Sequence, residues 1–277
     1  MTVIETLTSR EIPDNIRLAA EVGWPDDEAD WRVVHEAAVV LGARKEGRLI
    51  GQGALGLYDG QAGTIAKMVV SPSAQRQGVG AAILDALLVE ADRRGLAAVG
   101  LVATPSGQPL YESRGFVVTG HVAVFIGTPT PDPALVSERV IELTKVEPAL
   151  ALDRRFISCS RAGMLRGRFN EARVGALHGS PAGDPRGFAL ANGKGEYALV
   201  GPVIADDEAV ARALTRVIFK ACNGAVRIDV PAEHTAFRDW LRSLGLPEKG
   251  VRPEMARGGA LPWQVPQRFA LATAAWG

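Results

Sequence analysis

Two hydrophobic periods alternate along the first 126 residues. Short apolar segments bounded by turn residues have the spacing of strands, and they lie at residues 3–8, 37–44, 48–57, 63–70, 97–103 and 116–126. Segments with apolar residues at every third or fourth position have the spacing of helices, and they lie at residues 11–22, 28–36, 79–94 and 108–114. Gly95 and Gly115 then end the last two helices. The pattern predicts a mixed, mostly antiparallel sheet flanked by helices.

The second half of the chain repeats this plan. Predicted strands lie at 139–145, 173–177, 187–191, 197–204 and 225–230, and predicted helices at 150–156, 163–169, 208–221 and 235–243. Gly95 and Gly115 are 20 residues apart, and Gly224 and Gly245 are 21 residues apart. Similar units at this separation predict two tandem copies of one fold, of the α/β (α+β) class.

A proline-rich segment separates the two halves. Residues 127–134 contain three prolines, and proline cannot continue a helix or the interior of a sheet. We therefore place a boundary near Thr130, with predicted domains at 1–129 and 130–277. Each half is long enough to form a hydrophobic core of its own.

Composition excludes several classes of function. Lys plus Arg and Asp plus Glu both number 31, so the basic excess typical of a nucleic-acid binder is missing. The sequence shows no signal peptide and no apolar run long enough to span a membrane, and we expect a cytoplasmic protein. The two cysteines and four histidines are isolated from one another, so we predict no metal site.

A glycine-rich turn before the long helix is the strongest local signal. It reads Gln75-Arg-Gln-Gly-Val-Gly-Ala81. Backbone N–H groups at a helix start have no partner within the helix, and together with the helix dipole they form an anion site. A second pattern, Gly51-x-Gly-x-x-Gly56, matches the dinucleotide fingerprint in letters only. It lies inside a predicted strand and opens no helix, so we interpret it as a place of close backbone approach.

The order of motifs resembles the GNAT superfamily of acyl-CoA N-acyltransferases. Gln75, Gly78 and Gly80 match the Q/R-x-x-G-x-G/A pyrophosphate motif of that superfamily, and the segment Leu110-Tyr-Glu-Ser-Arg-Gly-Phe116 resembles its LYExxGF motif. The order of strands and helices over residues 3–126 matches as well. The resemblance implies acetyl-CoA as cofactor and a GNAT fold for each half.

The resemblance also implies roles for individual residues. The loop would bind the pyrophosphate, the strand before it would pair with pantetheine and hold the acetyl carbonyl, and two further residues would contact the cofactor. These cofactor-binding candidates are Met68, Val69, Val70, Gln75, Arg76, Gln77, Gly78, Val79, Gly80, Ala81, Thr104 and Arg114. Thr104 replaces the Asn of many relatives and has a shorter reach. Tyr111 is the candidate general acid that would protonate the departing CoA thiolate.

The acceptor side is less specific in the sequence. Attack on a thioester needs a neutral amine, so a carboxylate, a histidine or a water chain must take a proton. Asp26, Asp27, Glu28 and His35 lie in the predicted helical region that borders the acceptor in relatives, and each has an ordinary alternative as a surface group or helix cap. Trp24 and Trp31 are candidates for the wall of the acceptor site, with core packing as the alternative.

The second half lacks the signals of a cofactor site. Asp206-Asp207-Glu208 opens its long helix, where acidic residues would repel a pyrophosphate, and Leu241 stands opposite Tyr111. It also contains Gly201-Pro-Val-Ile-Ala-Asp206, Ile228-Asp-Val-Pro231 and Met255-Ala-Arg-Gly258. These segments resemble the C-terminal domain of bacterial tandem GNAT proteins of the YitH type, with Glu254 in place of the usual Arg. We predict a GNAT-like domain without a cofactor site that helps to shape the acceptor site through Asp229, Glu254 and Trp263.

The resulting hypothesis is an acetyl-CoA-dependent N-acetyltransferase that acts by direct attack in a ternary complex. The expected acceptor is a small-molecule or peptide amine, and the expected assembly is a monomer or homodimer. Two alternatives stay open: a non-catalytic acetyl-CoA-binding or sensing module, and an enzyme that acetylates protein Nα or lysine amines.

Overall fold

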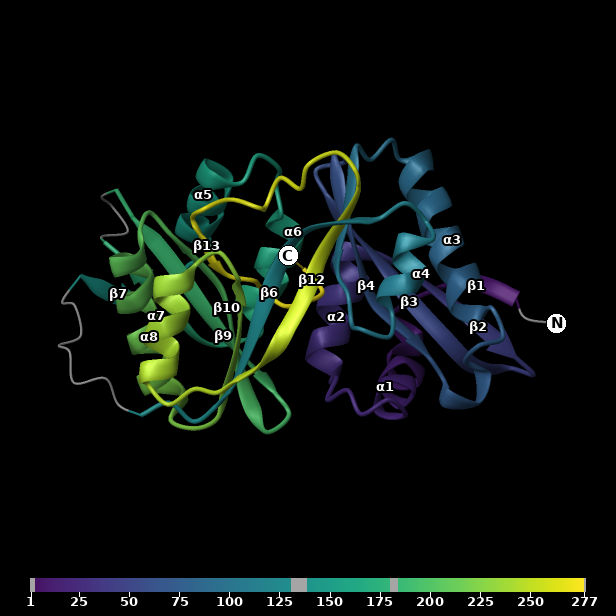
Figure 1. Cartoon of the computed structure of the whole chain (residues 1–277), viewed down its shortest axis with the longest axis horizontal. Helices are drawn as coiled ribbons and strands as arrows, with labels where there is room; N and C mark the ends of the chain where they lie inside the picture. Colours follow the sequence, from purple (N-terminus) through teal and green to yellow (C-terminus); the bar gives the residue numbers. More distant parts are fainter. Residues whose placement is uncertain (1–2, 131–138, 180–183, 277) are drawn as a thin grey trace.

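One continuous sheet of 13 strands runs through the computed structural model (Figure 1). The structure describes residues 3–130, 139–179 and 184–276, so residues 131–134 of the predicted linker lie outside the described residues. The strand order is β1-β2-β3-β4-β5-β12-β6-β11-β10-β9-β8-β7, and β13 pairs with β10 beside this path. Within the described residues, no helix is long and apolar enough to cross a membrane.

The first half of the chain forms six strands of this sheet. They are β1 (Val3–Leu7), β2 (Ala38–Lys45), β3 (Arg48–Tyr58), β4 (Ala62–Val70), β5 (Ala98–Val102) and β6 (Val117–Gly127). Its helices are η1 (Ser9–Glu11), α1 (Ile12–Ala20), α2 (Glu28–Ala37), η2 (Pro72–Ala74), α3 (Val79–Arg93) and α4 (Gln108–Glu112). All the strands and helices predicted for this half are present.

The second half follows in the same order. Its strands are β7 (Val140–Glu142), β8 (Ala172–His178), β9 (Gly187–Lys194), β10 (Tyr197–Ala205), β11 (Val226–Pro231), β12 (Glu248–Gly258) and β13 (Arg268–Ala270). Its helices are α5 (Glu147–Phe156), α6 (Ala162–Asn170), α7 (Glu208–Cys222) and α8 (Thr235–Ser243). The long helices α3 and α7 each have 15 residues. The predicted repeat of one fold is therefore confirmed.

The two halves exchange one strand each at the centre of the sheet. β12 belongs to the second half in sequence, yet it lies between β5 and β6 and pairs antiparallel with both. β6 belongs to the first half and pairs antiparallel with β11. In Figure 1 these two strands run side by side between the halves. The order of strands is consequently the same when it is read from either end, with the parallel pairs β4–β5 and β10–β11 in equivalent places.

The hydrophobic pattern did not predict β12 or β13. The segment Glu248–Gly258 contains few β-branched residues, and its Pro and Gly are residues that strands usually lack. It forms a strand because β5 pairs with it on one side and β6 pairs with it on the other. Such long-range pairing leaves no local signal in the sequence.

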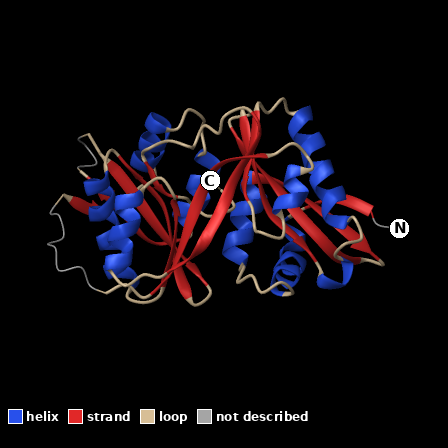
Figure 2. Ribbon diagram, in the orientation of Figure 1, coloured by secondary structure: helices blue, strands red, loops and turns tan. Residues whose placement is uncertain are grey.

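Helices cover both faces of the sheet (Figure 2). In the first half, α3 packs on one face and shares a core with Leu55 of β3, whereas Ala54 of the same strand faces the opposite core. α3 lies close to β3: a Cβ at Gly53 would stand only 3.0 Å from side-chain atoms of Ile83 and Leu87. This close approach accounts for Gly51 and Gly53, whereas a Cβ at Gly56 would meet Trp276 and Thr64. The Gly51-x-Gly-x-x-Gly56 pattern lies within β3, as expected.

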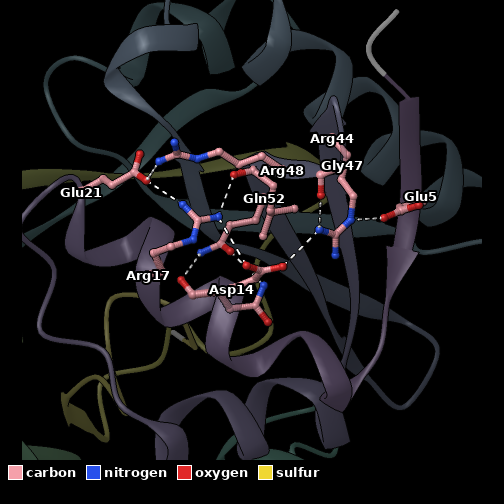
Figure 3. A network of polar contacts seen from close by, with 10 residues as sticks. Glu5, Asp14, Arg17, Glu21, Arg44, Gly47, Arg48 and Gln52 are labelled. Atoms are coloured by element: carbon pink, nitrogen blue, oxygen red, sulfur yellow. Dashed lines mark hydrogen bonds and ion pairs between the residues drawn. The ribbon is translucent and has the colours of Figure 1, made fainter.

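A polar network fixes α1 on the β2–β3 hairpin (Figure 3). Arg17 of α1 donates to the carbonyl oxygen of Leu49 at 3.0 Å, and Arg44 of β2 donates to Asp14 of α1 at 3.1 Å. Beneath them the buried Asn15 donates to Gln52 at 2.9 Å. These contacts fix α1 on the sheet, and the loop that leads to α2 follows directly from it.

A buried ion pair joins β12 to β13. Glu254 accepts two hydrogen bonds from the guanidinium of Arg268, at 2.9 and 2.8 Å, and the two side chains are 3% and 1% exposed. Trp263 and Gln264 donate to the same carboxylate. Burial alone would raise the pKa of Glu254, but Arg268 and these donors hold it below its ordinary value.

We expect Arg268→Met to destabilise the fold by about 3 kcal/mol or more, because it leaves the buried Glu254 carboxylate without its counter-charge. The double variant Glu254→Leu/Arg268→Met should regain at least about 1 kcal/mol of that loss, since both charges are then removed together. Urea unfolding of the wild type, both single variants and the double variant measures this coupling. Strictly additive losses would show that the pair does not act as a unit.

Candidate active site

β4 and β5 separate after a short parallel ladder. They pair only at Ala62–Ala98, Gly63–Val99 and Thr64–Gly100, and the remainder of β4 then diverges from β5. A register shift in the β3–β4 ladder falls in the diverging part, where Lys67 and Met68 together stand opposite the single residue Gly53. Such a bulge leaves backbone groups outside the ladder. β4 and β5 are therefore separated beyond Thr64, and the gap between them opens beside the bulge in β4.

The glycine-rich turn leads from β4 into α3. Gly78 is the N-cap of α3, with φ of 81°, and no side chain caps the helix. The N–H groups at the start of α3 are thus free of side-chain acceptors. A Cβ at Gly80 would meet only Val70 and Leu110, at 3.4 and 3.8 Å, which is ordinary contact. Packing within the chain therefore does not require glycine at position 80, and space lies open over the helix start.

A cavity of about 480 Å³ lies where β4 and β5 separate. Its walls come from both halves of the chain. The first half contributes Gly23, Trp24, Pro25, Asp26, Asp30, Val34, Ile65, Ala66, Lys67, Met68, Val102, Thr104 and Tyr111. The second half contributes Lys194, Tyr197, Leu199, Arg227, Asp229, Arg252, Thr273, Ala274, Ala275 and Trp276.

Tyr111 lies at the first-half side of this cavity. It comes from α4, its ring packs edge-on against Phe116, and only 8% of the residue is exposed. Its hydroxyl makes no hydrogen bond to any other residue that the structure describes. Burial raises the pKa of Tyr111 to about 12. The phenol is therefore protonated at neutral pH and has its proton available to a ligand.

Two lysines hold a pair of aspartates in the cavity wall. Lys67 donates to Asp26 at 2.7 Å, and Lys194 donates to Asp26 at 2.6 Å and also to Asp30. The Asp26 side chain is 3% exposed. Burial alone would raise the pKa of Asp26, but the two lysine charges outweigh it and hold the pKa below its ordinary value. Asp26 is thus fixed as an ionised bridge between the two halves.

A second ion pair lies on β11. Arg227 donates two hydrogen bonds to Asp229, both of 2.9 Å, and Asp229 is buried. The two residues are two positions apart on one strand and therefore share a face of the sheet. Their guanidinium and carboxylate form a planar, bidentate pair at the second-half side of the cavity.

The C-terminal segment closes the floor of the cavity. Residues 273–276 line it, and the carbonyl oxygen of Trp276 accepts a hydrogen bond of 2.7 Å from Tyr58. Thr64 donates to the carbonyl oxygen of Ala275 at 3.3 Å, close to the point where β4 leaves β5. The last residues that the structure describes therefore belong to the site.

The equivalent separation in the second half is filled by the chain itself. β10 and β11 pair only from Ala198–Val226 to Val200–Ile228, and β13 then pairs with β10 at Val203 and Ile204. The Leu271 N–H donates to the Asp229 carbonyl oxygen on β11. A Cβ at Gly201 would stand 1.8 Å from the Leu271 carbonyl oxygen, so only glycine admits this segment.

The start of α7 is also satisfied internally. Asp207 is its N-cap and accepts from the Val210 N–H at 2.9 Å. That backbone hydrogen bond lowers the pKa of Asp207. Arg186 pairs with both Asp206 and Asp207. The carboxylates thus occupy the position that is open at the start of α3. Leu241, opposite Tyr111 in the repeat, is buried in the core of the second half.

The structure brings some of the predicted residues together and separates others. Met68, Thr104, Tyr111, Trp24 and Asp229 all line the cavity. Gln75 and Gln77 donate to backbone carbonyl oxygens of Val70 and Ser73, which braces the glycine-rich turn. Arg76 is exposed beside it, and Arg114 pairs with Asp85 of α3.

Several residues considered for the acceptor side do not line the cavity. Trp31 is fully buried in the core, with Lys67 over its ring at 5.2 Å. Glu254 and Trp263 are buried with Arg268, as described above, so their side chains hold β12 and β13 together. Asp27 caps α2 through the Asp30 N–H, and His35 contacts Asn15. These placements favour structural roles for all five.

Sequence reasoning missed the cationic residues of the cavity. Lys67 left one signal, a charge within an otherwise apolar strand. Lys194, Arg227 and Arg252 are dispersed over the second half and reach the cavity only through the tertiary fold. Among the described residues, no group of three or more His, Cys, Asp or Glu side chains could hold a metal ion.

Comparison with known proteins identifies the family. Two models, each described as an acetyltransferase (GNAT) domain, match residues 25–130 and 149–269. The chain is a tandem GNAT protein. It is accordingly an acyltransferase of the GNAT type. This tandem GNAT protein is 26% identical over 270 residues to the uncharacterized N-acetyltransferase YitH of Bacillus subtilis (strain 168). The aligned region covers 95% of this chain and 94% of YitH.

Solved structures share the fold of the tandem GNAT protein. A proposed acetyltransferase from Pyrococcus horikoshii superimposes with a TM-score of 0.85 and 20% identity, over 100% of this chain and 96% of its own. A tandem GNAT protein from the clavulanic acid biosynthesis pathway superimposes with a TM-score of 0.70 and 16% identity, over 94% and 99% of the two chains. Both likenesses extend over the two halves together.

We expect Asp26→Asn to destabilise the tandem GNAT protein by about 3 kcal/mol at pH 7, because it removes a buried carboxylate from two lysines. Since the folded pKa of Asp26 is depressed, its contribution is present above the ordinary value of 3.8 and is lost as the pH falls through the lower folded value. Urea unfolding between pH 3 and pH 7 measures the difference.

Asp27→Asn is the matched control for this prediction. Asn is as good an N-cap as Asp, so this neighbouring change should cost less than about 0.5 kcal/mol. Equal losses from the two variants, or a loss from Asp26→Asn that grows towards low pH, would contradict the assigned role of Asp26.

Proposed function

We propose that this chain is an acetyl-CoA-dependent N-acetyltransferase with one cofactor site, which lies in its first half. The observation that carries the proposal is the presence of three features around β4. They are the uncapped start of α3, the separation of β4 from β5, and the cavity that Met68 and Tyr111 line. A nucleotide pyrophosphate, an extended arm and a reactive group would need these three places in this order.

The residues present fit acetyl-CoA. The N–H groups from Gln77 to Ala81 would hold the pyrophosphate, where the helix dipole favours an anion and where Gly80 leaves space. Met68, Val69 and Val70 of the diverging part of β4 would pair with the pantetheine arm, as an added strand would. Acetyl-CoA would supply an activated acetyl thioester. The surrounding residues would position it and move protons.

Tyr111 would act as the general acid. Its hydroxyl is free of partners within the described residues, and its pKa of about 12 keeps the proton on Oη at the pH of assay. Negative charge develops on the leaving sulfur as the C–S bond breaks, and a phenol beside it would donate a hydrogen bond to that sulfur and then deliver the proton. Thr104 lines the same cavity, and its Oγ1 accepts a hydrogen bond from the Gly107 N–H and lies 3.2 Å from the Ser106 Oγ.

Water is the proposed proton acceptor from the attacking amine. The carboxylates that line the cavity are Asp26, Asp30 and Asp229, and all three are in ion pairs. No histidine is among the cavity-lining residues that the structure describes. A paired, ionised aspartate is a weak base. The activity should therefore rise with pH as the free acceptor amine loses its own proton.

The second half would carry no cofactor. β13 and Leu271 lie in the gap equivalent to the one between β4 and β5, and Asp207 caps the equivalent helix. The same segment continues from Leu271 to Trp276 into the cavity of the first half. We infer that this half binds no cofactor and instead contributes residues to the acceptor site.

A small amine fits this cavity better than a protein acceptor. The cavity is bordered by residues of α2, β4, β9, β10, β11, β12 and the C-terminal segment. A peptide substrate needs a groove open at both ends for an extended backbone. A site of about 480 Å³ with walls from both halves is of the size that holds one small molecule.

We expect Gly80→Glu to abolish acetyl-CoA binding, with at least a 100-fold loss of affinity, because the new carboxylate would meet the pyrophosphate at the helix start. Stability should change by less than about 1 kcal/mol, since an acidic residue suits the first turn of a helix. Titration calorimetry with acetyl-CoA measures the affinity and should give one site per wild-type chain.

Ala82→Glu is the control for Gly80→Glu. It adds the same charge to an exposed position of the same helix, two residues further on, and should bind acetyl-CoA within about threefold of the wild type. Wild-type affinity in Gly80→Glu, or two sites per wild-type chain, would remove the basis of the proposed cofactor site.

We expect Tyr111→Phe to lower kcat by roughly 10²–10⁴-fold, since the proton donor is lost, and to leave the KM for acetyl-CoA nearly unchanged. The variant keeps the ring that packs on Phe116. Steady-state kinetics between pH 6 and pH 10 with an amine panel measures both constants. In the wild type, kcat/KM should rise across this range without a fall from Tyr111, whose pKa is about 12. A variant with wild-type kcat would exclude Tyr111 as the acid.

A further inference from the structure

The cavity contains one cationic side chain that has no ion pair within the described residues. Its cationic lining residues are Lys67, Lys194, Arg227 and Arg252, and its anionic ones are Asp26, Asp30 and Asp229. The two lysines neutralise Asp26 and Asp30, and Arg227 neutralises Asp229. Arg252 is left, because it has no ion pair and no side-chain hydrogen bond to any residue that the structure describes.

The position of Arg252 makes this charge significant. Arg252 comes from β12, opposite Val122 of β6, at the centre of the exchanged strands. Its side chain is half-buried in the cavity wall. Burial and the positive charge of Arg227 lower the pKa of Arg252, and together they outweigh Asp229 and Tyr197, which raise it. Two neighbouring guanidinium groups that are partly removed from solvent repel each other. An anion that binds to them compensates for this repulsion and for the lost hydration.

The two halves of the chain bring different chemistry to the cavity. Tyr111 and Met68 come from the first half, where the acetyl group would be presented. Arg252, Arg227 and Tyr197 come from the second half. Arg252 lies near Thr104, because the Ala103 N–H donates to the Pro253 carbonyl oxygen at 2.9 Å. An acceptor with its amine at the thioester would therefore place a second group against the arginines.

We propose that Arg252, supported by Arg227, binds an anionic oxygen group of the acceptor, so that the acceptor is an amine that also carries a carboxylate or a phosphate. Arginine suits this task because its planar fork donates two parallel hydrogen bonds to either group. This inference rests on the proposed acetyl transfer and names the class of its second substrate. It also gives the second half a direct part in substrate recognition.

Matched pairs of acceptors test this assignment by kinetics. One pair is phenylalanine and phenylalanine amide, and the other is phosphoethanolamine and ethanolamine, compared at saturating acetyl-CoA. The two members of each pair share a primary amine, although their amine pKa values differ, so each member is assayed over the range from pH 7 to pH 10. For each compound, kcat/KM is calculated from the concentration of its unprotonated amine. On this basis the wild type should favour the anionic member of one pair at least tenfold. The pair that shows the larger preference identifies the anion as a carboxylate or a phosphate.

Arg252→Gln should remove this preference. We expect its KM for the anionic member to rise at least tenfold, its kcat/KM for the uncharged member to stay within twofold, and its KM for acetyl-CoA to be unchanged. Arg252→Lys, which keeps the charge, should retain part of the preference. Arg257→Gln is the control, because Arg257 lies on the same strand but pairs with Asp92 outside the cavity. Equal losses for both members of a pair, or no preference in the wild type, would overturn the proposal.

Ligand binding without turnover separates this proposal from the proposed activity. Thermal unfolding of the wild type and of Arg252→Gln is measured with each of the four compounds, with and without CoA. If no amine is acetylated, stabilisation of the wild type alone by the anionic members still supports the anion site, and the acetyl transfer is rejected. If the anionic compounds stabilise both proteins equally or neither, the anion site is rejected, whatever the activity.

Discussion

The insertion of β12 between β5 and β6 is the contact on which the rest of the molecule depends. It joins two sheets that would each end at an open edge into one continuous sheet, and it buries hydrogen-bonding groups that would otherwise invite association. Because the exchanged strands lie where the halves meet, residues from β9 to β12 stand across the cavity from β4 and α4.

The two halves share one fold but differ at the gap between their parallel strands. Where β4 leaves β5, the chain has a bulge, an uncapped helix and a cavity. Where β10 leaves β11, it has its own strand β13, and Asp207 caps the helix. The separation of two parallel strands exposes hydrogen-bonding groups, and these need partners in either case. In the second half the C-terminal segment is the partner, and we propose that in the first half the cofactor is.

Local order in this chain could be predicted from its sequence, and the long-range pairings could not. The apolar periods that predict helix 79–94 act over a few residues, and α3 lies there. β12 was missed because its strand character comes from β5 and β6, which are distant in sequence. Glu254 was expected at the acceptor, but Arg268, 14 residues away, holds it in the core. Arg252 and Lys194 reach the cavity only after the halves have joined. The roles assigned to Tyr111 and to the glycine-rich turn remain predictions that their positions favour.

A crystal structure of the full chain with acetyl-CoA would show whether the first half alone holds the cofactor. We expect one cofactor molecule per chain, with its pyrophosphate at the start of α3, its pantetheine arm between β4 and β5, and its thioester beside Tyr111. β13 should stay between β10 and β11. A cofactor bound between β10 and β11, with β13 displaced, would show that the proposed division of roles between the halves is wrong.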